Sequence, residues 1–241
     1  MFGVYARPDL VDVATFLKNK YRMYDFHCGE FFSHVFIVGG DGTLLEAVRR
    51  FPCIFNTIVI HLGLGRVNFY RSVPPTLPLE NIVEKIESGQ YKIIELMTLE
   101  TSNCVAVNEI SIYRREPGRL MSFKIVTEEG ELVGRADGVI VSTPQGTTGY
   151  VISTFGPVVD YKSPVVVISF IAPYTSFLRP FVLSTTRVLV ETREDSVLVC
   201  DGRINSISRE FEIRRGDRRL KLAVVGEFNF LNRVFERLRS V

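Results

Sequence analysis

The chain has 241 residues, with 29 basic and 27 acidic side chains, a formal net charge of +2 and 46% hydrophobic residues. This balance excludes a disordered or fibrous chain, and the small net charge argues against a dedicated nucleic-acid binder, which usually carries a clear basic excess. A chain of this length forms one large domain or two modest ones, and its core is large enough to be stable without disulfide bonds or structural metal ions.

None of the four cysteines belongs to a CxxC pair, so no local zinc or redox motif is available. They are Cys28, Cys53, Cys104 and Cys200. Their wide spacing favours reduced, buried thiols. The first ten residues lack the basic and apolar regions of a signal peptide, and the most apolar run, residues 165–172, is far shorter than the ~20 residues of a spanning helix. We therefore expect a cytoplasmic protein that does not bind membranes or nucleic acid.

Short apolar runs alternate with helical patterns over the first ninety residues. Extended segments are expected at residues 2–5, 21–26, 35–38 and 57–61. Helices are expected over residues 8–17, with Pro8 in the first turn, over residues 44–50, and over residues 82–86 before Gly89. Strands that alternate with helices predict a parallel, Rossmann-like sheet whose faces are covered by helices.

Helical periodicity is nearly absent between Tyr91 and Val225. Three hairpins are expected there: residues 123–134 around a Glu-Gly-Glu turn, residues 188–202, and residues 211–225 with the basic run 214–219 at the bend. The last segment, residues 228–238, has apolar side chains at helical spacing. The chain is therefore expected to form an α/β domain over 1–92, an all-β domain over 93–226, and a C-terminal helix, 227–241, that packs back at the domain interface.

A glycine-rich turn follows the strand expected at residues 35–38. It reads Gly39-Gly40-Asp41-Gly42-Thr43 and leads directly into a helix. A strand, a glycine turn and a helix N-terminus together present backbone amides and a positive dipole end, which suit phosphate groups. Thr43 can cap the helix. The turn is neither a Walker A sequence nor GxGxxG, because it has no lysine and holds an acid.

Asp41 is the informative residue of this turn, because a carboxylate beside a phosphate site is electrostatically unfavourable unless it has a role. It could accept a proton from an attacking hydroxyl, or help to hold a Mg²⁺ ion that bridges phosphates. The plain alternative is that Asp41 makes an Asx turn and that the glycines make a tight bend. Local chemistry leaves both interpretations open.

A second group of polar residues lies downstream. Asn108-Glu109 follows a strand-like run, and the stretch from Arg135 to Tyr150 runs through an apolar strand into a turn crowded with hydroxyl groups. Hydroxyls, amides and a nearby acid can hold the ribose and amide groups of a nucleotide, although threonine, proline and glycine are also common in any β-connection. Three scattered histidines, His27, His34 and His61, are expected to be structural rather than metal ligands.

These segments together resemble the NAD kinase family. The resemblance rests on GGDGT at residues 39–43, on Asn108-Glu109, and on DGVIVSTPQGTTGY at residues 137–150, and it extends over about residues 36–203. The third segment is the specific one, since GGDGT also occurs in lipid kinases and phosphofructokinases. The resemblance implies transfer of a phosphoryl group to the 2′-hydroxyl of the adenosine ribose of NAD, which gives NADP.

The resemblance also implies roles for individual residues. Asp41 is the proton acceptor, and the donor phosphates lie by Gly39, Gly40, Gly42 and Thr43. NAD is contacted by Asp41, Gly42, Asn108, Glu109, Arg135, Asp137, Thr148, Tyr150 and Ser153. Further expectations are Mg²⁺ as the cofactor, ATP or polyphosphate as the donor, and a homo-oligomer, dimer or tetramer, in which neighbouring subunits complete each site.

The chain departs from the family pattern at several positions. Where the family usually reads N-T-G-R-L-G-F-L, residues 63–70 read GLGRVNFY, so that Gly63 replaces an asparagine. Gly149 replaces an alanine, and Arg203 follows Asp201-Gly202 where glutamine is common. Two other functions stay open: another GGDGT-type kinase that acts on a lipid or sugar, and a noncatalytic nucleotide-binding regulator, in which a carboxylate beside phosphate brings little benefit.

Overall fold

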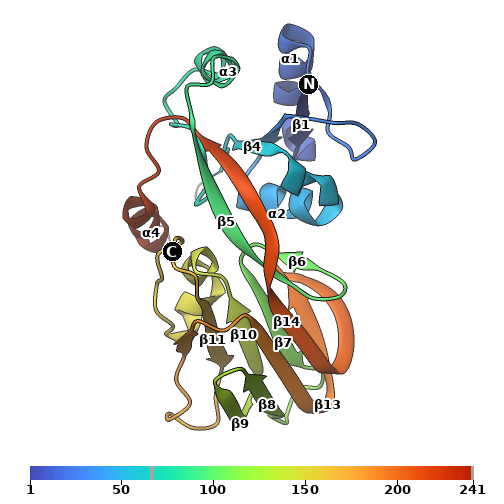
Figure 1. Cartoon of the computed structure of the whole chain (residues 1–241), viewed down its shortest axis with the longest axis vertical. Helices are drawn as coiled ribbons and strands as arrows, with labels where there is room; N and C mark the ends of the chain where they lie inside the picture. The colour runs from blue at the N-terminus through green and yellow to red at the C-terminus, as the bar shows by residue number, and fades with distance from the viewer. Residues whose placement is uncertain (66–67, 240–241) are drawn as a thin grey trace. The chain divides into compact units, whose positions relative to one another are not determined.

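The computed structural model describes residues 1–65 and 68–239. Its contacts divide the chain into two compact units: unit 1 comprises Met1–Leu96 and Arg219–Val241, and unit 2 comprises Met97–Arg218. Two long strands, β5 (Lys92–Glu100) and β14 (Arg203–Val224), each run from one unit into the other (Figure 1). The divisions therefore fall inside these strands, whereas the sequence pattern placed them at 92/93 and 226/227, near the strand ends.

Unit 1 is built on a parallel sheet, as the alternating pattern predicts. Its strands are β1 (Phe2–Ala6), β2 (Tyr24–Asp25), β3 (His34–Val38) and β4 (Ile58–His61). They lie in the order β2-β1-β3-β4, and the C-terminal part of β14 pairs with β4, also in parallel. The α/β fold class expected for this part of the chain is confirmed.

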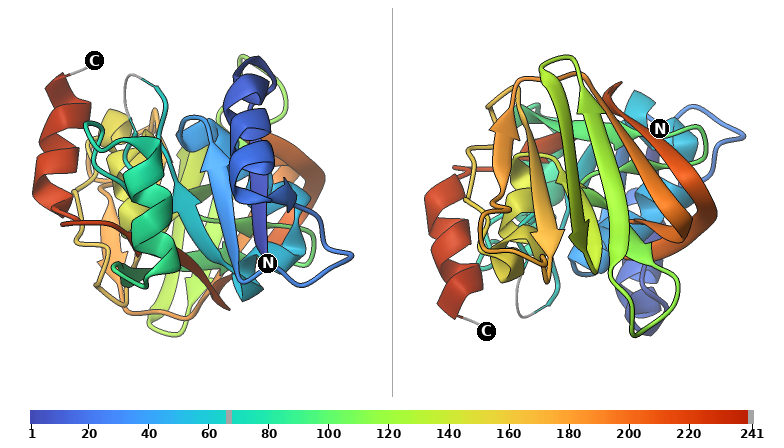
Figure 2. Two further views of the ribbon diagram at one scale, coloured as in Figure 1. Left: turned by 90° about the horizontal axis from the view of Figure 1, so that it is seen from above. Right: turned by 90° about the horizontal axis from the view of Figure 1, so that it is seen from below.

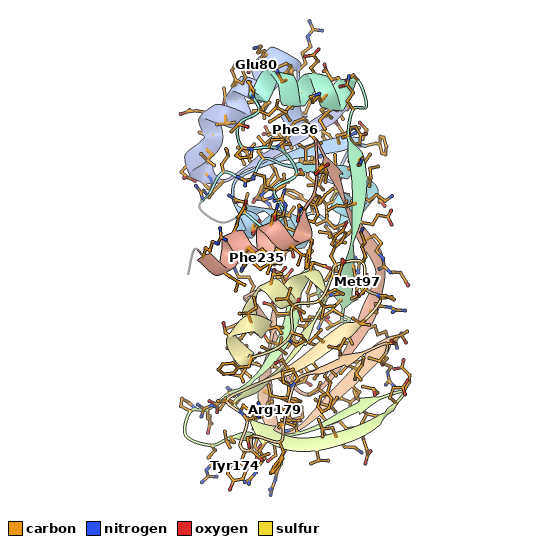
Figure 3. All side chains as sticks on the ribbon, turned by 90° about the vertical axis from the view of Figure 1, so that its left-hand side faces the viewer. Phe36, Glu80, Met97, Tyr174, Arg179 and Phe235 are labelled. Atoms are coloured by element: carbon orange, nitrogen blue, oxygen red, sulfur yellow. A yellow bond between two sulfur atoms is a disulfide. The ribbon has the colours of Figure 1, made fainter. Side chains whose placement is uncertain are left out.

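Helices cover the unit 1 sheet on both faces. These are α1 (Val11–Tyr21) and α3 (Leu79–Glu87) on one face and α2 (Asp41–Arg50) on the other. Unit 1 also contains η1 (Pro8–Leu10), η2 (Pro52–Asn56) and α4 (Phe230–Arg239). One core joins α1 and α3 to alternate residues of the strands, including Phe36, which is labelled in Figure 3. The view from above in Figure 2 shows α1 in dark blue and α3 in blue-green in front of the strands. Tyr5, next to the core residue Val4 in β1, instead meets Phe51 at the end of α2.

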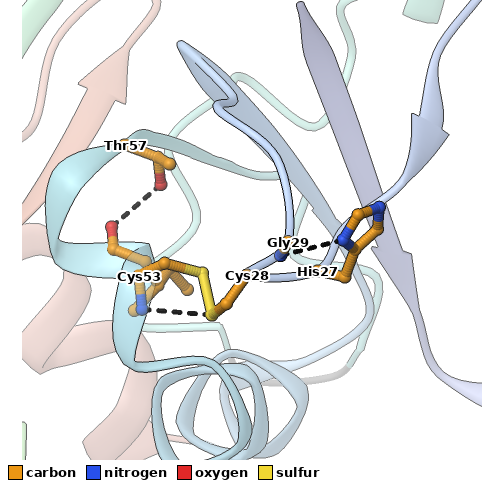
Figure 4. Close-up of a disulfide and its surroundings, with 6 residues drawn as sticks. His27, Cys28, Gly29, Cys53 and Thr57 are labelled. Atoms are coloured by element: carbon orange, nitrogen blue, oxygen red, sulfur yellow. Dashed lines mark hydrogen bonds between the residues drawn. A yellow bond between two sulfur atoms is a disulfide. The ribbon is translucent and has the colours of Figure 1, made fainter.

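A disulfide joins Cys28 to Cys53 in unit 1, with 5.5 Å between the two Cα atoms (Figure 4). The expectation of four reduced thiols is therefore wrong for this pair. The pair could not be predicted from the spacing in the sequence, because the two cysteines lie 25 residues apart. They belong to the segments that follow β2 and α2, and only the folded sheet brings these segments together. Cys104 and Cys200 form no disulfide.

Unit 2 is an antiparallel β structure, as expected. Its strands are β6 (Val105–Ala106), β7 (Glu109–Arg114), β8 (Met121–Thr127), β9 (Gly130–Ala136), β10 (Gly138–Ser142), β11 (Val166–Ile171), β12 (Phe181–Leu183) and β13 (Arg187–Cys200). The order is β12-β11-β10-β7-β13-β14, with β8 on β13 and β9 on β8. The view from below in Figure 2 shows β8 and β9 side by side. Two short 3-10 helices, η3 (Gln145–Thr148) and η4 (Tyr150–Thr154), follow β10.

One of the three predicted hairpins is confirmed, and two are wrong. β8 and β9 pair around residues 128–129. Residues 188–200 instead belong to the single strand β13 and residues 211–224 to β14, and the hairpin lies between these two strands, at Asp201-Gly202. Both residues have positive φ, +44° and +76°, as a type I′ turn requires.

The basic run at 214–219 is not a bend, because it lies inside the long strand β14. Gly216 in this run is explained by the packing of a neighbouring strand. A Cβ atom at Gly216 would lie 2.2 Å from Thr98 Oγ1 and 2.6 Å from Glu100 Oε1. Glycine here permits the close approach of β5, which pairs with β14, rather than a change of chain direction. Among the described residues, no helix is long and apolar enough to cross a membrane.

Candidate functional site

The glycine-rich turn of unit 1 lies between β3 and α2, as predicted. Helix α2 begins at Asp41, three residues before the expected start, with Gly40 as the N-cap. Thr43 therefore does not cap the helix: it is 5% exposed, and its Oγ1 would lie only 2.2 Å from a Cβ atom at Gly39. The glycine at residue 39 lets the strand pack directly against the first turn of α2, whose first amides have no partner within the helix.

The Asp41 carboxylate holds a second loop of unit 1. Its Oδ2 accepts a hydrogen bond from the amide of Phe69 at 2.9 Å, and its Oδ1 accepts one from the amide of Tyr70 at 3.1 Å. An Asx turn bonds only to backbone two residues away, so the expectation of an Asx turn at Asp41 is wrong. The side chain is 16% exposed, and thus it is held in place while remaining accessible at the helix N-terminus.

His61 lies directly behind this turn. The imidazole is completely buried, its Nε2 is 3.1 Å from the carbonyl oxygen of Gly39, and its Nδ1 is 4.0 Å from Asp41 Oδ1. Burial lowers the pKa of His61, although the nearby Asp41 carboxylate acts in the opposite direction. The ring is therefore a neutral donor that fixes the carbonyl of the glycine turn. Nothing in the spacing of the three histidines indicated this position.

Gly63 and Asn68 flank a loop that departs from the family pattern; its residues 66 and 67 lie outside the described part of the chain. Gly63 has φ +65°, a left-handed conformation that glycine adopts freely and asparagine adopts more readily than most other residues. Asn68 is 6% exposed, and its Nδ2 donates to the carbonyl oxygen of Gly65 at 2.7 Å. Its Oδ1 would lie 3.4 Å from a Cβ atom at Gly40, and no hydrogen-bond partner of this buried oxygen is present in the described residues.

In unit 2, a carboxylate again organises a loop that is distant in sequence. Asp201 accepts hydrogen bonds from three successive backbone amides, those of Val107 at 2.8 Å, Asn108 at 2.8 Å and Glu109 at 3.1 Å. Asp201 was noted from the sequence only as a weak resemblance to the family. Its Asp-Gly turn is the signal that could have shown how it is oriented.

The TPQGTTGY segment packs against the same Asn108 backbone. The Asn108 carbonyl accepts hydrogen bonds from the Thr143 amide at 2.9 Å and from the Ser142 hydroxyl at 3.1 Å. A Cβ atom at Gly146 would lie 2.1 Å from this carbonyl oxygen. Gln145 is completely buried and donates from Nε2 to the carbonyls of Met97 and Val107. The second and third family motifs therefore pack directly against each other.

The side chains in unit 2 that are predicted to contact a dinucleotide differ in their exposure to solvent. Burial raises the pKa of Tyr113 to about 12, with smaller upward effects from Tyr150 and Glu109, which places these three groups together. The rings of Tyr113 and Tyr150 are stacked with centroids 6.4 Å apart. Thr148 is 3% exposed and donates its hydroxyl to the Gln145 carbonyl, so its hydroxyl faces the protein. Ser153 is exposed.

Asp137 and Arg135 are engaged by neighbours in unit 2. Arg114 makes two contacts with the Asp137 carboxylate, at 2.9 and 3.3 Å. Arg135 is exposed, and its guanidinium lies 4.1 Å from the ring centre of Tyr174, which Figure 3 labels in the loop after β11. Both predicted residues are accessible to some degree, but neither lies in the packed Asn108 segment.

Comparisons with known proteins identify the family of this chain. A family model described as the ATP-NAD kinase C-terminal domain matches residues 107–224. An NAD kinase from Thermococcus kodakarensis is 32% identical over 255 residues, which cover 88% of this chain and 88% of that protein. The chain belongs to the NAD kinase family. It is an enzyme of that family, and the predicted resemblance is confirmed.

Other relatives extend the comparison. An NAD kinase from Bacteroides fragilis is 30% identical over 86% of this chain and 74% of its own length. A bifunctional NADP phosphatase/NAD kinase from Methanocaldococcus jannaschii is 28% identical over 90% of this chain, but the chain spans only 42% of that protein.

Two solved NAD kinase structures share the fold. One, from Archaeoglobus fulgidus in complex with ATP, has a TM-score of 0.81 and 22% identity, and the match covers both chains completely. The other, the yeast NADH kinase in complex with NADH, has a TM-score of 0.84 and 18% identity, over 99% of this chain and 87% of that one. These likenesses confirm the predicted fold class.

Each unit thus brings part of the predicted site together. Unit 1 gathers Asp41 and the glycine turn, and unit 2 gathers Asn108, Glu109 and Tyr150 around the packed turn. Five residues near these groups were not selected as site residues from the sequence. Three have been described above: His61, Asn68 and Asp201. The other two lie on α4: Arg233 donates to the Phe69 carbonyl, and Arg237 Nη1 lies 3.9 Å from Asp41 Oδ2. Within residues 1–65 and 68–239, no cluster of three or more histidine, cysteine or acidic residues is arranged to hold a metal ion.

Proposed function

We propose that the protein transfers a phosphoryl group from ATP or polyphosphate to the 2′-hydroxyl of the adenosine ribose of NAD, which gives NADP. The observation that carries the proposal is the Asp41 carboxylate, fixed by two backbone amides at the N-terminus of α2 and still 16% exposed. A carboxylate in a phosphate-binding turn is useful when a hydroxyl must lose a proton there.

In this mechanism the glycine turn binds the phosphate groups of the donor. The backbone amides at the start of α2 and the positive end of its dipole stabilise the negative charge of the phosphoryl group. Asp41 accepts the proton of the 2′-hydroxyl as the ribose oxygen bonds to the terminal phosphorus of the donor. The P–O bond between that phosphorus and the rest of the donor breaks, and ADP or a shortened polyphosphate leaves. Because His61 is neutral and donates to the Gly39 carbonyl, it keeps the turn in shape without adding charge. Catalysis is mainly positioning and electrostatic stabilisation.

Unit 2 supplies the groups that recognise the dinucleotide. Asn108 and Glu109 are proposed to contact a ribose, and Tyr150, Thr148 and Ser153 to line the same ligand. The Thr148 hydroxyl donates to the Gln145 carbonyl, so Thr148 is proposed to contact the ligand with its other atoms. Asp137, held by Arg114, is proposed to bind the nicotinamide amide, with Arg135 nearby in sequence.

Mg²⁺ is the proposed cofactor. Hard oxygen atoms suit this ion, and it is commonly held by the phosphates of a nucleotide, by water and by one or two protein oxygens. The buried Asn68 Oδ1 beside Gly40 is a suitable protein oxygen, whereas each Asp41 oxygen already accepts a backbone amide. When bound, Mg²⁺ neutralises phosphate charge.

Donor choice and assembly are part of the same proposal. ATP is the ligand of the Archaeoglobus structure whose fold the chain shares, and ATP is therefore the first donor to test. A homo-oligomer is proposed, in which a neighbouring subunit completes each site. A cytoplasmic location is proposed as well.

The direct test is NADP formation by the purified protein. The protein is incubated with NAD, Mg²⁺ and either ATP or polyphosphate, and an NADP-specific dehydrogenase reports the product. We expect NADP with at least one donor, and little NADP after the metal is removed with a chelator. If neither donor gives NADP above a protein-free blank, the proposed reaction is wrong. Binding of NAD without turnover would favour the noncatalytic regulator, and turnover of a lipid or sugar alone would favour another GGDGT-type kinase.

Asp41→Asn tests the proposed base. The amide keeps the size of the side chain and loses the ability to accept the hydroxyl proton, so we expect kcat to fall at least ~10²-fold. Calorimetry should show that NAD still binds. Glu46→Gln is the matched control, because it removes a carboxylate from an exposed position of the same helix, and it should keep kcat within about twofold.

A further inference from the structure

The C-terminal helix α4 is anchored to the loop that Asp41 holds. Arg233 of α4 donates from Nη1 to the carbonyl oxygens of Asn68 at 3.2 Å and Phe69 at 3.1 Å. The Phe69 ring packs edge-on against Phe228 and Phe230, and the guanidinium of Arg233 lies 4.6 Å from the Phe228 ring centre. The loop is thus held through its amides by Asp41 and through its carbonyls by α4.

Arg237 lies four residues after Arg233 and therefore on the same face of α4. Its Nη1 is 3.9 Å from Asp41 Oδ2. This distance exceeds the 2.7–2.9 Å that is usual for a charge-assisted hydrogen bond. A guanidinium carries five N–H donors in a planar fork, so that Arg237 can face the carboxylate and also bind a phosphate group.

Positively charged side chains outnumber negatively charged ones around Asp41 and Arg237. The charged side chains linked here are three arginines and two carboxylates: Arg71, Arg233, Arg237, Asp41 and Glu236. Burial, followed by the like charge of Arg71, lowers the pKa of Arg233 to about 10. Crowded cations at the positive end of α2 are a favourable environment for an anion.

A second, independent feature points to a ligand at the same turn. Asn68 is more than nine-tenths buried, and its Nδ2 is fixed by the Gly65 carbonyl, so that its amide cannot be reversed without loss of that bond. This orientation leaves Oδ1 against Gly40, with no protein partner among the described residues. A buried acceptor of this kind needs a donor or a cation, such as the metal ion that accompanies a phosphate chain.

We propose that Arg237 of the C-terminal helix binds the phosphate chain of the donor at the glycine turn, and that Arg233 is the positioning residue that holds it there. The inference rests on the proposed function, because that function makes the donor a phosphate chain. Arg237 adds a cation with a bidentate fork to a turn that holds no lysine, and it thereby supplies the positive charge that a Walker A lysine would provide.

The test measures binding of magnesium tripolyphosphate, a phosphate chain without a nucleoside, to the full chain by calorimetry. Arg237→Met keeps the length of the side chain and removes its charge, and we expect the dissociation constant to rise about 10- to 100-fold. Arg237→Lys should lose less. Arg239→Met, an exposed arginine on the same helix, is the matched control and should bind as the wild type does.

The outcomes separate this inference from the proposed reaction. If the wild type does not bind tripolyphosphate, or if Arg237→Met binds it as tightly as the wild type, the inference is overturned. If the wild type binds it through Arg237 but makes no NADP, the inference stands and the proposed reaction fails.

A double-mutant cycle tests the role of Arg233. If Arg233 acts through Arg237, Arg233→Met should weaken tripolyphosphate binding in the wild-type background and add little in the Arg237→Met background. A residue that only stabilises the fold would lower the melting temperature of both proteins and leave the two effects on binding independent. Additive losses in affinity would therefore contradict the positioning role.

Discussion

Each unit has a turn with an aspartate whose carboxylate accepts hydrogen bonds from successive backbone amides of a distant loop. In unit 1 the Asp41 carboxylate accepts two successive backbone amides, from residues 28 and 29 positions away. In unit 2 the Asp201 carboxylate accepts three, from residues 92 to 94 positions away. Each aspartate holds a loop that local sequence alone would leave undefined.

The surroundings of the two carboxylates differ, and this difference separates chemistry from architecture. Asp41 starts a helix, faces an arginine at 3.9 Å and lies beside a buried, neutral histidine. Asp201 sits in a type I′ turn between two strands and orients the backbone of Asn108-Glu109. We infer that Asp41 both holds its loop and reacts, whereas Asp201 only presents other residues to the ligand.

The largest effect on stability is expected at Gly146, in the unit 2 turn. A Cβ atom there would lie 2.1 Å from the Asn108 carbonyl oxygen, and backbone atoms cannot move aside cheaply. Gly146→Ala should lower the free energy of unfolding of unit 2 by ~3 kcal/mol, measured by urea denaturation. Gly42→Ala in the unit 1 turn is the control, since nothing lies within 4 Å of its Cβ position and alanine favours a helix. Equal stability of the two variants would show that the unit 2 turn is not tightly packed.

Asp201→Asn should have the next largest effect. Asp201 Oδ1 accepts two of the three amides and Oδ2 accepts the third, so an asparagine must place its NH₂ group against at least one amide, which should cost ~2 kcal/mol of stability. Because the backbone of Asn108 and Glu109 then loosens, KM for NAD should rise more than kcat falls. Steady-state kinetics check this split, and a loss confined to kcat would mean that Asp201 takes part in the reaction.

A smaller effect, dependent on pH, is expected from His61. Burial lowers its pKa in the folded state, so below its ordinary value of about 6.5 the unfolded chain takes up a proton that the folded chain does not. Stability should therefore fall as the pH drops below about 6.5, by at most ~1.4 kcal/mol per pH unit. His61→Gln retains a donor for the Gly39 carbonyl and should lack this component when melting temperatures are compared from pH 7.5 to 5. Parallel curves for the two proteins would refute the neutral, buried histidine.

Local signals explain what could be predicted from the sequence. The strand, glycine turn and helix around residues 39–43 are adjacent in the chain, and their order alone indicates a phosphate-binding turn. The alternating pattern likewise predicts the parallel sheet of unit 1 and the change to β structure in unit 2. The family motifs added the expected chemistry.

The parts that were missed depend on residues that are close in space and distant in sequence. The partners of Asp41 at residues 69 and 70, the Cys28–Cys53 disulfide, and the Asp201 bonds to residues 107–109 have no local pattern. Gly216 could not be interpreted from the sequence for a similar reason. Glycine is typical both of turns and of sites of close packing, and only the neighbouring strand in the structure shows which of the two applies.

The most direct test of the central claim compares NADP formation by Asp41→Asn and Asp201→Asn at saturating donor, with the NAD concentration varied up to saturation. We expect Asp41→Asn to lose at least ~10²-fold in kcat while it still binds NAD, and Asp201→Asn to keep kcat within about tenfold while its KM for NAD rises. Full turnover by Asp41→Asn would contradict the account, because Asp41 would then hold its loop and do nothing more.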